Sequence, residues 1–507
     1  MTPNITQFKS LARGANVIPV FTELLADMET PVSIFAKLPR NISAFLLESA
    51  ENVDNWGRYS FIGCNPRAEF RLRGNLGELA FKSGKFIRSP ENAEGMEALS
   101  PLRDYLAGRK IAELPELPRF FGGAVGYFGY ECVNLFEKLP PPKGEMEWDD
   151  ARFGLYDDVI IFDNIHHTAK IVACAHTDDF YTLEEAYADA SSRVSELIKL
   201  FRSESKAGIA ESRDIDTARE VFMRSEMDGS SYMEMVERAK EYIRSGEIIQ
   251  VVLSRKFGVK ANITPLSAYR ALRLINPSPY MFCFRDAEGS CLVGSSPETL
   301  IRLCDGKVQV RPIAGTRSRG SDKNEDIKLA SELLANEKER AEHLMLVDLG
   351  RNDISRFCYA GSVQVSDFMS IERYSHVMHM VSTVNGEAKP GVDAFDALAA
   401  VFPAGTLSGA PKVRAMQIIN ELESCRRGPY GGAAGYIGYG GNMDMAITIR
   451  TLQMRGNALT VQAGAGIVYD SNPDAELEET RIKAQAVSKA VKIAGGIDSL
   501  AVDSIGR

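Results

Sequence analysis

A series of short apolar runs, separated by turns of only a few residues, restricts the fold of the second half of this chain more than any other feature. Strands that follow one another this closely pair as antiparallel neighbours, because a parallel crossover needs a dozen or more residues. We therefore expect an α+β fold in which helices flank an antiparallel or mixed β-sheet sandwich. The expected strands of this half are 248–260, 278–286, 290–295, 299–304, 307–315, 432–440, 445–455 and 458–470.

The helices are expected from caps and stop signals. Thr182 and Glu185 form a capping box at one helix start, and Ser231 and Glu234 form another. Gly246 supplies the stop of the second helix. The expected helices are 182–201, 231–245, 325–346, 392–401, 411–424 and 474–494, and N-terminal strands are expected at 31–38, 156–164 and 169–176.

The chain is long enough for more than one domain, with 507 residues in all. The stretch SESKAGIAESRD is small and polar and has no steady periodicity, which is typical of a connection. We expect an N-terminal regulatory or partner-binding domain at 1–205, a connection at 206–229 and a catalytic domain at 230–507.

Composition excludes several classes of function. A net charge of -9 argues against a broad nucleic-acid surface. The N-terminus has no apolar core of a signal peptide, and no apolar run approaches the length of a membrane span. The eight cysteines are scattered, without metal-ligand spacing, so we expect reduced thiols in a cytoplasmic protein.

Two pairs of glutamates have the spacing of a shared helix face. Glu339 and Glu342 lie three residues apart, as do Glu476 and Glu479, and Lys483 falls on the second face. If the two faces meet, their oxygen atoms suit Mg²⁺, which takes one or two protein carboxylates and leaves other positions to water and substrate. The alternative is two solvated helix faces, which is the commoner situation for glutamate pairs taken alone.

The glycine-rich stretches do not form nucleotide-binding motifs. Gly464 and Gly466 lack the third glycine of a dinucleotide fingerprint, because position 469 is Tyr469, and no Walker motif is present. The two glycines could let backbone amides approach a substrate carboxylate, or they could mark a tight strand bend. The segment GTLSGAPK is not a hydrolase elbow, and Ser408 is expected in a turn or cap.

Ten sequence blocks between about 230 and 490 resemble the chorismate-utilising enzymes, and they occur in the order of that family. This family comprises anthranilate synthase component I, aminodeoxychorismate synthase component I, isochorismate synthase and salicylate synthase. The N-terminal segments LLESAE and GRYSFIGCNP are also similar. The ten blocks are QVVLSR (250–255), GSSPETL (294–300), RPIAGTRSRG (311–320), EHLMLVDLGRNDI (342–354), VMHMVSTVNG (377–386), GTLSGAPKVRAM (405–416), GPYGGAAGY (428–436), ITIRT (447–451), QAGAGIV (462–468) and EETRIKA (478–484).

The resemblance implies the family fold with an N-terminal regulatory portion, and it implies a role for each site residue. Glu298 would protonate the departing C4 hydroxyl, with a pKa raised by burial, and His379 would take part in the loss of pyruvate. Without the resemblance, Glu298 is a turn carboxylate and His379 a structural histidine. The implied sets are Glu342, Glu479, Glu339 and Glu476 for Mg²⁺; Glu298, His379, Thr316 and Gln250 for catalysis; and Tyr430, Arg450, Gly464, Ala465, Gly466, Lys483 and Thr316 for substrate.

Two positions distinguish the reactions of this family. Members that add water carry a lysine base at the position of Gln250, and a glutamine cannot remove a proton from water. Aminodeoxychorismate synthases commonly carry a lysine nucleophile where this chain has Ala314. The expected reaction is addition of ammonia to chorismate followed by loss of pyruvate, which gives anthranilate. An aminodeoxychorismate or aminodeoxyisochorismate synthase that keeps the pyruvate, and a non-catalytic binding subunit, remain as alternatives.

The resemblance also implies two partners. The chain has no cysteine in a glutaminase-like elbow, so ammonia is expected from a separate glutamine amidotransferase subunit in a heterodimer or heterotetramer. Feedback inhibition by L-tryptophan is the second expectation, and ordinary strand packing is the alternative for the same segments. The expected inhibitor-binding residues are Leu47, Glu48, Ser49, Asn276, Pro279, Tyr280 and Met281.

Overall fold

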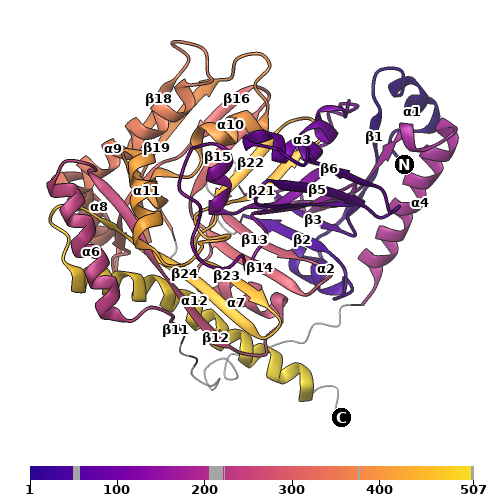
Figure 1. Ribbon diagram of the computed structural model, residues 1–507. Helices are drawn as coiled ribbons and strands as arrows, with labels where there is room; N and C mark the ends of the chain where they lie inside the picture. The colour runs from indigo at the N-terminus through magenta and orange to yellow at the C-terminus, as the bar shows by residue number, and fades with distance from the viewer. Residues whose placement is uncertain (50–56, 205–220, 222, 375–376, 504–507) are drawn as a thin grey trace.

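The computed structural model describes residues 1–49, 57–204, 221, 223–374 and 377–503, with side chains described up to residue 498. Two large β-sheets pack face to face, and helices cover their outer sides (Figure 1). All pairings between the named strands are antiparallel, which confirms the expected fold class.

Sheet one contains strands from both halves of the chain. In spatial order they are β1 (Val17–Leu25), β10 (Thr168–His176), β9 (Asp158–Asp163), β3 (Tyr59–Cys64), β2 (Ala44–Glu48), β13 (Tyr280–Arg285), β14 (Ser290–Ser296), β23 (Thr451–Arg455), β24 (Ala458–Ile467), β12 (Gln250–Lys260) and β11 (Arg224–Ser225), with β20 (Gly409–Ala410) paired to β12.

Sheet two also contains strands from both halves of the chain. Its order is β17 (Ile313–Ser318), β19 (Val377–Glu387), β16 (Lys307–Val310), β15 (Thr299–Cys304), β22 (Met443–Ile447), β21 (Ala433–Gly438), β7 (Gly123–Phe128), β8 (Ala151–Tyr156), β4 (Ala68–Arg73), β5 (Leu76–Phe81) and β6 (Phe86–Arg88), with β18 (Gln364–Arg373) paired to β19.

The two halves of the chain therefore share both sheets. β2 pairs with β13 in sheet one, and β7 pairs with β21 in sheet two. The proposed division into regulatory and catalytic regions stays a prediction about their roles. Most of the expected connection at 206–229 lies outside the described residues, and its end, from Gly229, is already helical.

Helices and short 3₁₀ turns connect and cover the strands. The helices are α1 (Ile5–Leu11), α2 (Pro31–Lys37), α3 (Ser100–Ala107), α4 (Leu183–Arg202), α6 (Gly229–Arg244), α7 (Pro265–Ile275), α8 (Lys323–Ala335), α9 (Glu337–Ser355), α10 (Ala394–Val401), α11 (Lys412–Leu422) and α12 (Pro473–Asp503). The 3₁₀ turns are η1 (Gly95–Leu99), η2 (Tyr130–Leu135), η3 (Thr177–Asp179) and η4 (Gly405–Leu407).

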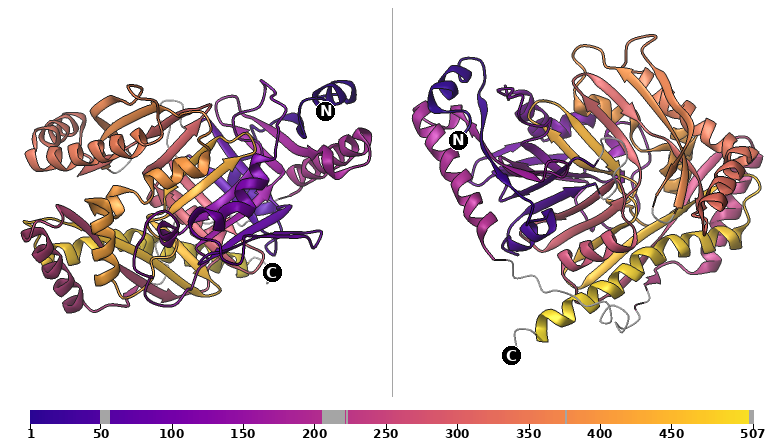
Figure 2. Two further views of the ribbon diagram at one scale, coloured as in Figure 1. Left: turned by 45° about the horizontal axis from the view of Figure 1, so that its top comes forward. Right: turned by 180° about the vertical axis from the view of Figure 1, so that it is seen from behind.

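Apolar side chains fill two separate layers. The first lies between the sheets and contains Phe70, Phe128 and Met445. The second lies between sheet one and its outer helices, where Val194 of α4 and Val487 of α12 are completely buried. Figure 2 shows α12 running along sheet one from behind. This double coverage explains why strands of sheet one are apolar on both faces.

Two local predictions about these helices are wrong, and in each case an N-cap residue explains the helix that the structure shows. The segment 31–38 is the helix α2 instead of a strand, because Thr30 forms a capping box with Ser33 and Pro31 occupies the first turn. The helix α6 begins at Gly229, because Asp228 accepts a hydrogen bond from the backbone of Ser231 and acts as N-cap. The Thr182 box of α4 is confirmed.

The expected strand 445–455 is divided between the two sheets. β22 belongs to sheet two and β23 to sheet one, so the chain crosses between the sheets at 448–450. A second crossing joins β14 of sheet one to β15 of sheet two at 297–298. Backbone hydrogen bonds from Ile447 N to Glu298 O and from Ser295 N to Arg450 O hold the two crossings side by side.

Candidate active site

Glu298 lies at one of these crossings, in a buried position. Its side chain accepts a hydrogen bond of 3.0 Å from the Thr406 hydroxyl, and the residue is only 7% exposed. Burial raises its pKa to about 8, although Thr406, Arg450 and Lys483 act in the opposite direction. The carboxyl group therefore carries a proton at neutral pH, as a general acid must.

His379 and Thr316 face each other on neighbouring strands of sheet two. They are register partners of β19 and β17, next to a bulge at Gly315. The Thr316 hydroxyl and His379 Nδ1 are 3.0 Å apart. Burial, together with the positive charge of Arg450, lowers the pKa of His379 to about 4. The imidazole is therefore neutral at pH 7 and can accept a proton.

Arg450 lies at the other crossing, in left-handed backbone conformation with φ 49°. Its guanidinium donates to Asn276 Oδ1 over 3.1 Å, and burial lowers its pKa. No carboxylate lies within ion-pair distance of Arg450 in the described part of the chain. A half-buried cation held by an amide, with backbone strain at the same residue, suits an anionic ligand.

Gly464, Ala465 and Gly466 lie on β24 in regular pairing with β12, so the alternative of a tight strand bend is wrong. The space that a side chain would occupy at Gly464 or Gly466 is filled by side chains of other residues. A Cβ at Gly464 would lie 2.8 Å from the Tyr430 hydroxyl, and one at Gly466 would lie 2.6 Å from Gln250 Nε2. Tyr430 and Gln250 therefore pack directly on this strand.

Lys483 connects this strand to the second glutamate pair. Its amino group donates to Gly464 O over 2.9 Å and forms an ion pair of 2.7 Å with Glu479. Gln250 Oε1 is buried and has no hydrogen-bond partner among the described residues. Buried acceptors are normally satisfied, so the open Gln250 Oε1 beside β24 is a candidate contact for a ligand.

The two glutamate pairs approach each other from different helices. Burial raises the pKa of Glu342, and repulsion from Glu339 and Glu479 adds to it; burial and Glu479 raise that of Glu476. The expected single helix 325–346 is wrong, because Asn336 ends α8 and its side chain caps α9 at Glu339. Glu339 also pairs with Arg317 at 3.1 Å.

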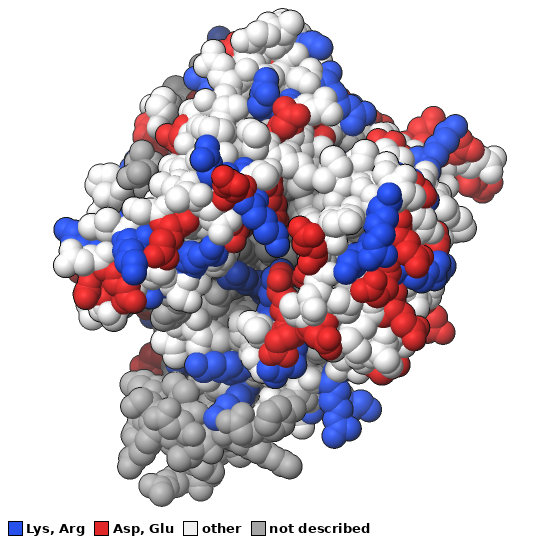
Figure 3. Space-filling model, turned by 90° about the vertical axis from the view of Figure 1, so that its left-hand side faces the viewer, with Lys and Arg blue, Asp and Glu red and all other residues white. Residues whose placement is uncertain are grey.

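These carboxylates fit Mg²⁺ through their chemistry. Within the ranges described, no group of three or more His, Cys, Asp or Glu side chains is placed to hold a metal ion. Mg²⁺ is commonly held by one or two carboxylates and an anionic substrate, and the mutual repulsion of Glu342 and Glu479 is the kind of strain that a cation relieves. Figure 3 shows a hollow with charged side chains of both signs on this side of the molecule.

A cavity of about 520 Å³ lies where β2 meets β13. Six of the expected inhibitor-binding residues line it, together with the rings of Phe61, Phe120 and Tyr436. Asn276 does not line it and instead bonds Arg450 and Ser295. The six residues are Leu47, Glu48, Ser49, Pro279, Tyr280 and Met281.

Sequence reasoning missed two elements of the site. Thr406, which bonds Glu298, lies inside the block GTLSGAPK, so the resemblance offered a signal for it. The buried ion pair of Arg427 with Glu423, 2.6 Å apart, had no such signal.

The Arg427 guanidinium is completely surrounded. It donates to the carbonyls of Leu407 and Val252, and it lies over the rings of Tyr130 and Tyr430 at 4.5 and 5.7 Å. It thereby holds Tyr430, the tyrosine that packs on β24, in place.

Comparison with known proteins agrees with this architecture. Residues 43–489 match the family of chorismate binding enzymes, so the chain belongs to that family and is a chorismate-utilising enzyme. It is 44% identical to anthranilate synthase component 1 of Acetivibrio thermocellus, over 98% of this chain and 99% of that protein. It is 46% identical to the protein of the same name from Aquifex aeolicus, over 97% and 98%.

Solved structures show the same fold. Anthranilate synthase component I from Streptococcus pneumoniae superposes with a TM-score of 0.75 at 34% identity, over 86% of this chain and 93% of that one. The isochorismate synthase MenF of Escherichia coli gives 0.69 at 18% identity, over 96% and 99%, which shows a shared fold only. Among the described residues, no helix is long and apolar enough to cross a membrane.

Replacing Arg427 with methionine should destabilise the protein by about 3–5 kcal/mol, because Glu423 would keep a buried charge without a partner. Urea unfolding measures the effect. The matched control is Arg481→Met, which breaks an exposed pair with Glu478 and should leave the unfolding midpoint unchanged. Equal midpoints for the two variants would contradict the structural role of Arg427.

Glu298 should make folding depend on pH. Its folded pKa of about 8 lies above the ordinary value of 4.5, so between these values the folded state holds one more proton than the unfolded state. Stability should therefore fall as pH rises, by up to about 1.4 kcal/mol per unit. Urea unfolding of wild type and Glu298→Gln at a series of pH values tests this; a pH-independent difference between them would show that the carboxyl titrates normally.

Proposed function

We propose that this enzyme converts chorismate and ammonia to anthranilate and pyruvate, as the chorismate-binding subunit of an anthranilate synthase and in the first committed step of tryptophan biosynthesis. The observation that carries the proposal is the combination of a protonated acid, Glu298, with a neutral base, His379, both of which feel the charge of the half-buried Arg450. The names of its full-length relatives agree with this assignment.

The first step is the replacement of the C4 hydroxyl. Ammonia forms a bond to C2 of the ring, the two ring double bonds shift toward C4, and the C4–O bond breaks, so that the hydroxyl leaves as water with the proton that Glu298 donates. Arg450 and Tyr430 hold a substrate carboxylate, and the strand Gly464–Gly466 offers its backbone to the other. The open acceptor Gln250 Oε1 can take an N–H of ammonia, and as an amide it leaves water unactivated.

The second step removes pyruvate. Neutral His379, oriented by Thr316, takes the proton from the carbon that carries the new amino group. The bond from the ring to the enolpyruvyl oxygen breaks, and the enol carbon takes up a proton to give pyruvate. The ring becomes aromatic, which makes this step favourable.

Mg²⁺ would be held by Glu342 and Glu479, with Glu339 and Glu476 beside them. When bound, it would neutralise the ring carboxylate of chorismate. Lys483 connects the metal-binding glutamates to the substrate strand, because it contacts both Glu479 and Gly464.

Ammonia would be supplied by a separate glutamine amidotransferase subunit, in a heterodimer or heterotetramer. Burial raises the pKa of Cys425 and Cys358 to about 11 and that of Cys64 to about 12, so these thiols stay protonated and are poor nucleophiles. All eight cysteines are free, which supports a reducing, cytoplasmic location.

L-Tryptophan would bind in the cavity between β2 and β13. The rings of Phe61, Phe120 and Tyr436 offer an aromatic wall to an indole. Burial raises the pKa of Glu48, which accepts a hydrogen bond from Tyr269. Tyr280, which lines this cavity, is also linked to the active site by a hydrogen bond. Its hydroxyl lies 3.1 Å from that of Thr299, the residue after Glu298.

Purified chain with chorismate, Mg²⁺ and ammonium at alkaline pH should form anthranilate and pyruvate in equal amounts, and L-tryptophan should suppress both. Fluorescence of anthranilate and separation of the products measure this. An amino-cyclohexadiene product without pyruvate would instead indicate an aminodeoxychorismate or aminodeoxyisochorismate synthase, which does not eliminate pyruvate. Unchanged chorismate, even with glutamine and a glutaminase subunit added, would contradict the proposal.

Replacing Glu342 or Glu479 with glutamine should lower Mg²⁺-dependent turnover by at least about 100-fold, because each change removes a charged ligand. Calorimetric titration with Mg²⁺ should show weakened binding independently of turnover. Glu478→Gln is the matched control, since Glu478 neighbours Glu479 but pairs with Arg481 at the surface. Full activity in the first two variants would remove these residues from the metal site.

A further inference from the structure

We infer that Arg255 is a positioning residue for the proposed Mg²⁺ site. It holds the turn of α12 that carries Glu476 and Glu479, because an arginine cannot bind a cation itself but can fix the residues that do. The inference rests on the proposed function, to which it adds a residue behind the carboxylates of the metal site. Arg255 lies on β12, and only 6% of the residue is exposed.

The hydrogen bonds that the Arg255 guanidinium donates within the described residues all end on one turn of α12. Nε and Nη2 donate to Thr480 Oγ1 over 3.0 and 2.7 Å, and Nη2 also donates to Leu477 O over 3.0 Å. These two acceptors belong to the residues that directly follow Glu476 and Glu479. Because the guanidinium is a rigid planar fork, its contacts fix both the distance and the orientation of this turn relative to β12.

Arg255 differs from the other buried arginines of the described chain in the partner of its charge. Arg311 pairs with Glu372, and Arg427 pairs with Glu423. Among the described residues, no carboxylate lies within ion-pair distance of Arg255. Its charge is therefore buried without an opposite charge to compensate it.

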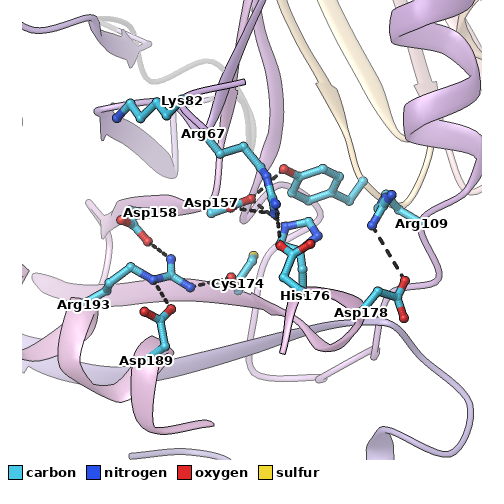
Figure 4. Close-up of polar contacts among 12 residues, drawn as sticks. Arg67, Lys82, Arg109, Asp157, Asp158, Cys174, His176, Asp178, Asp189 and Arg193 are labelled. Atoms are coloured by element: carbon cyan, nitrogen blue, oxygen red, sulfur yellow. Dashed lines mark hydrogen bonds and ion pairs between the residues drawn. The ribbon is translucent and has the colours of Figure 1, made fainter. Parts of the chain in front are cut away.

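Partly buried arginines in the first half of the chain also have carboxylate partners. Arg67 pairs with Asp157 at 3.2 Å, and Arg193 pairs with Asp189 at 2.8 Å and also with Asp158 (Figure 4). Ion pairing is thus the usual way in which this fold compensates a guanidinium that leaves water. The arrangement at Arg255 needs a different explanation.

Aromatic rings supply the remaining contacts of Arg255. Its guanidinium lies 5.1 Å from the ring centroid of Tyr232 on α6 and 4.9 Å from that of Phe257, within the range of cation–π contacts. A buried charge is still more costly than an apolar side chain of similar volume. Packing alone therefore gives no reason for an arginine here, whereas its directed hydrogen bonds to α12 do.

The turn that Arg255 holds serves both parts of the proposed site. It carries Glu476 and Glu479, and Lys483, one turn later, contacts both Glu479 and Gly464 O. A shift of this turn would therefore move the metal carboxylates and the contact to the substrate strand together. Residues that orient metal ligands typically contribute about 10- to 100-fold to metal affinity.

The test is calorimetric titration of the full chain with Mg²⁺. Arg255→Met and Thr480→Val should each weaken Mg²⁺ binding about tenfold or more, and the double variant should weaken it no further, because both changes break the same contact. The Mg²⁺ concentration for half-maximal turnover should rise by the same factor, whereas partial unfolding would instead lower kcat at every Mg²⁺ concentration. Arg255→Met should remain folded, because the Thr480 hydroxyl still donates to Leu477 O over 2.8 Å.

Two matched controls should bind Mg²⁺ as the wild type does. Lys256→Met removes a cation from the next residue of β12, which points to the other face of the strand and pairs with Glu147. Thr480→Ser keeps the hydroxyl that Arg255 contacts. Thermal unfolding checks that all variants are folded.

Wild-type Mg²⁺ affinity in Arg255→Met and Thr480→Val would overturn the inference while leaving the proposed metal site intact. An equal loss of affinity in Lys256→Met would also overturn it, because that result indicates a general effect of removing a cation from β12. Absence of Mg²⁺ binding by the wild type would contradict the metal site itself, and the inference with it.

Discussion

The buried ion pair of Arg427 and Glu423 is the constraint on which the rest of the structure depends. A buried charge is tolerated only when every donor and acceptor around it is satisfied. Glu423 accepts from the backbone and hydroxyl of Ser254 on β12, and the backbone of Arg427 donates to Glu131 of the N-terminal half. One cluster thus joins β12 to a turn from the other half of the chain, and it holds the ring of Tyr430 beside Arg427.

The second constraint is the continuity of the two sheets. Because β2 pairs with β13, and β13 pairs with β14, the proposed inhibitor cavity adjoins the strand that leads to Glu298. Asn276 follows α7 and holds Arg450, while Tyr280, four residues later, lines the cavity. This short segment therefore links the proposed inhibitor cavity to Arg450 through close-packed structure that deforms little.

Burial also explains how one site holds an acid and a base at the same pH. The same loss of water raises the pKa of Glu298 and lowers that of His379, because it disfavours the charged form of each. The crossings between the sheets bring these residues to Arg450. Glu298 and Arg450 therefore lie where neither strand pairing nor helix geometry dictates the backbone, and side chains from both sheets converge there.

The sequence by itself determined the fold class and most strands of the second half of the chain, because strand spacing is a local signal, and its family motifs proposed the residues of the site. It missed the strands β1 to β8 of the first half and β19, which carries His379. It also led to errors where two local signals compete, as at Thr30 with Pro31 and at Asn336. Only the tertiary structure decided that one expected strand is divided between two sheets and that Asn276 holds Arg450. It also decided the pKa of Glu298 and the pairing of Arg427 with Glu423. These properties depend on burial and on partners that meet through folding, which no spacing along the chain records.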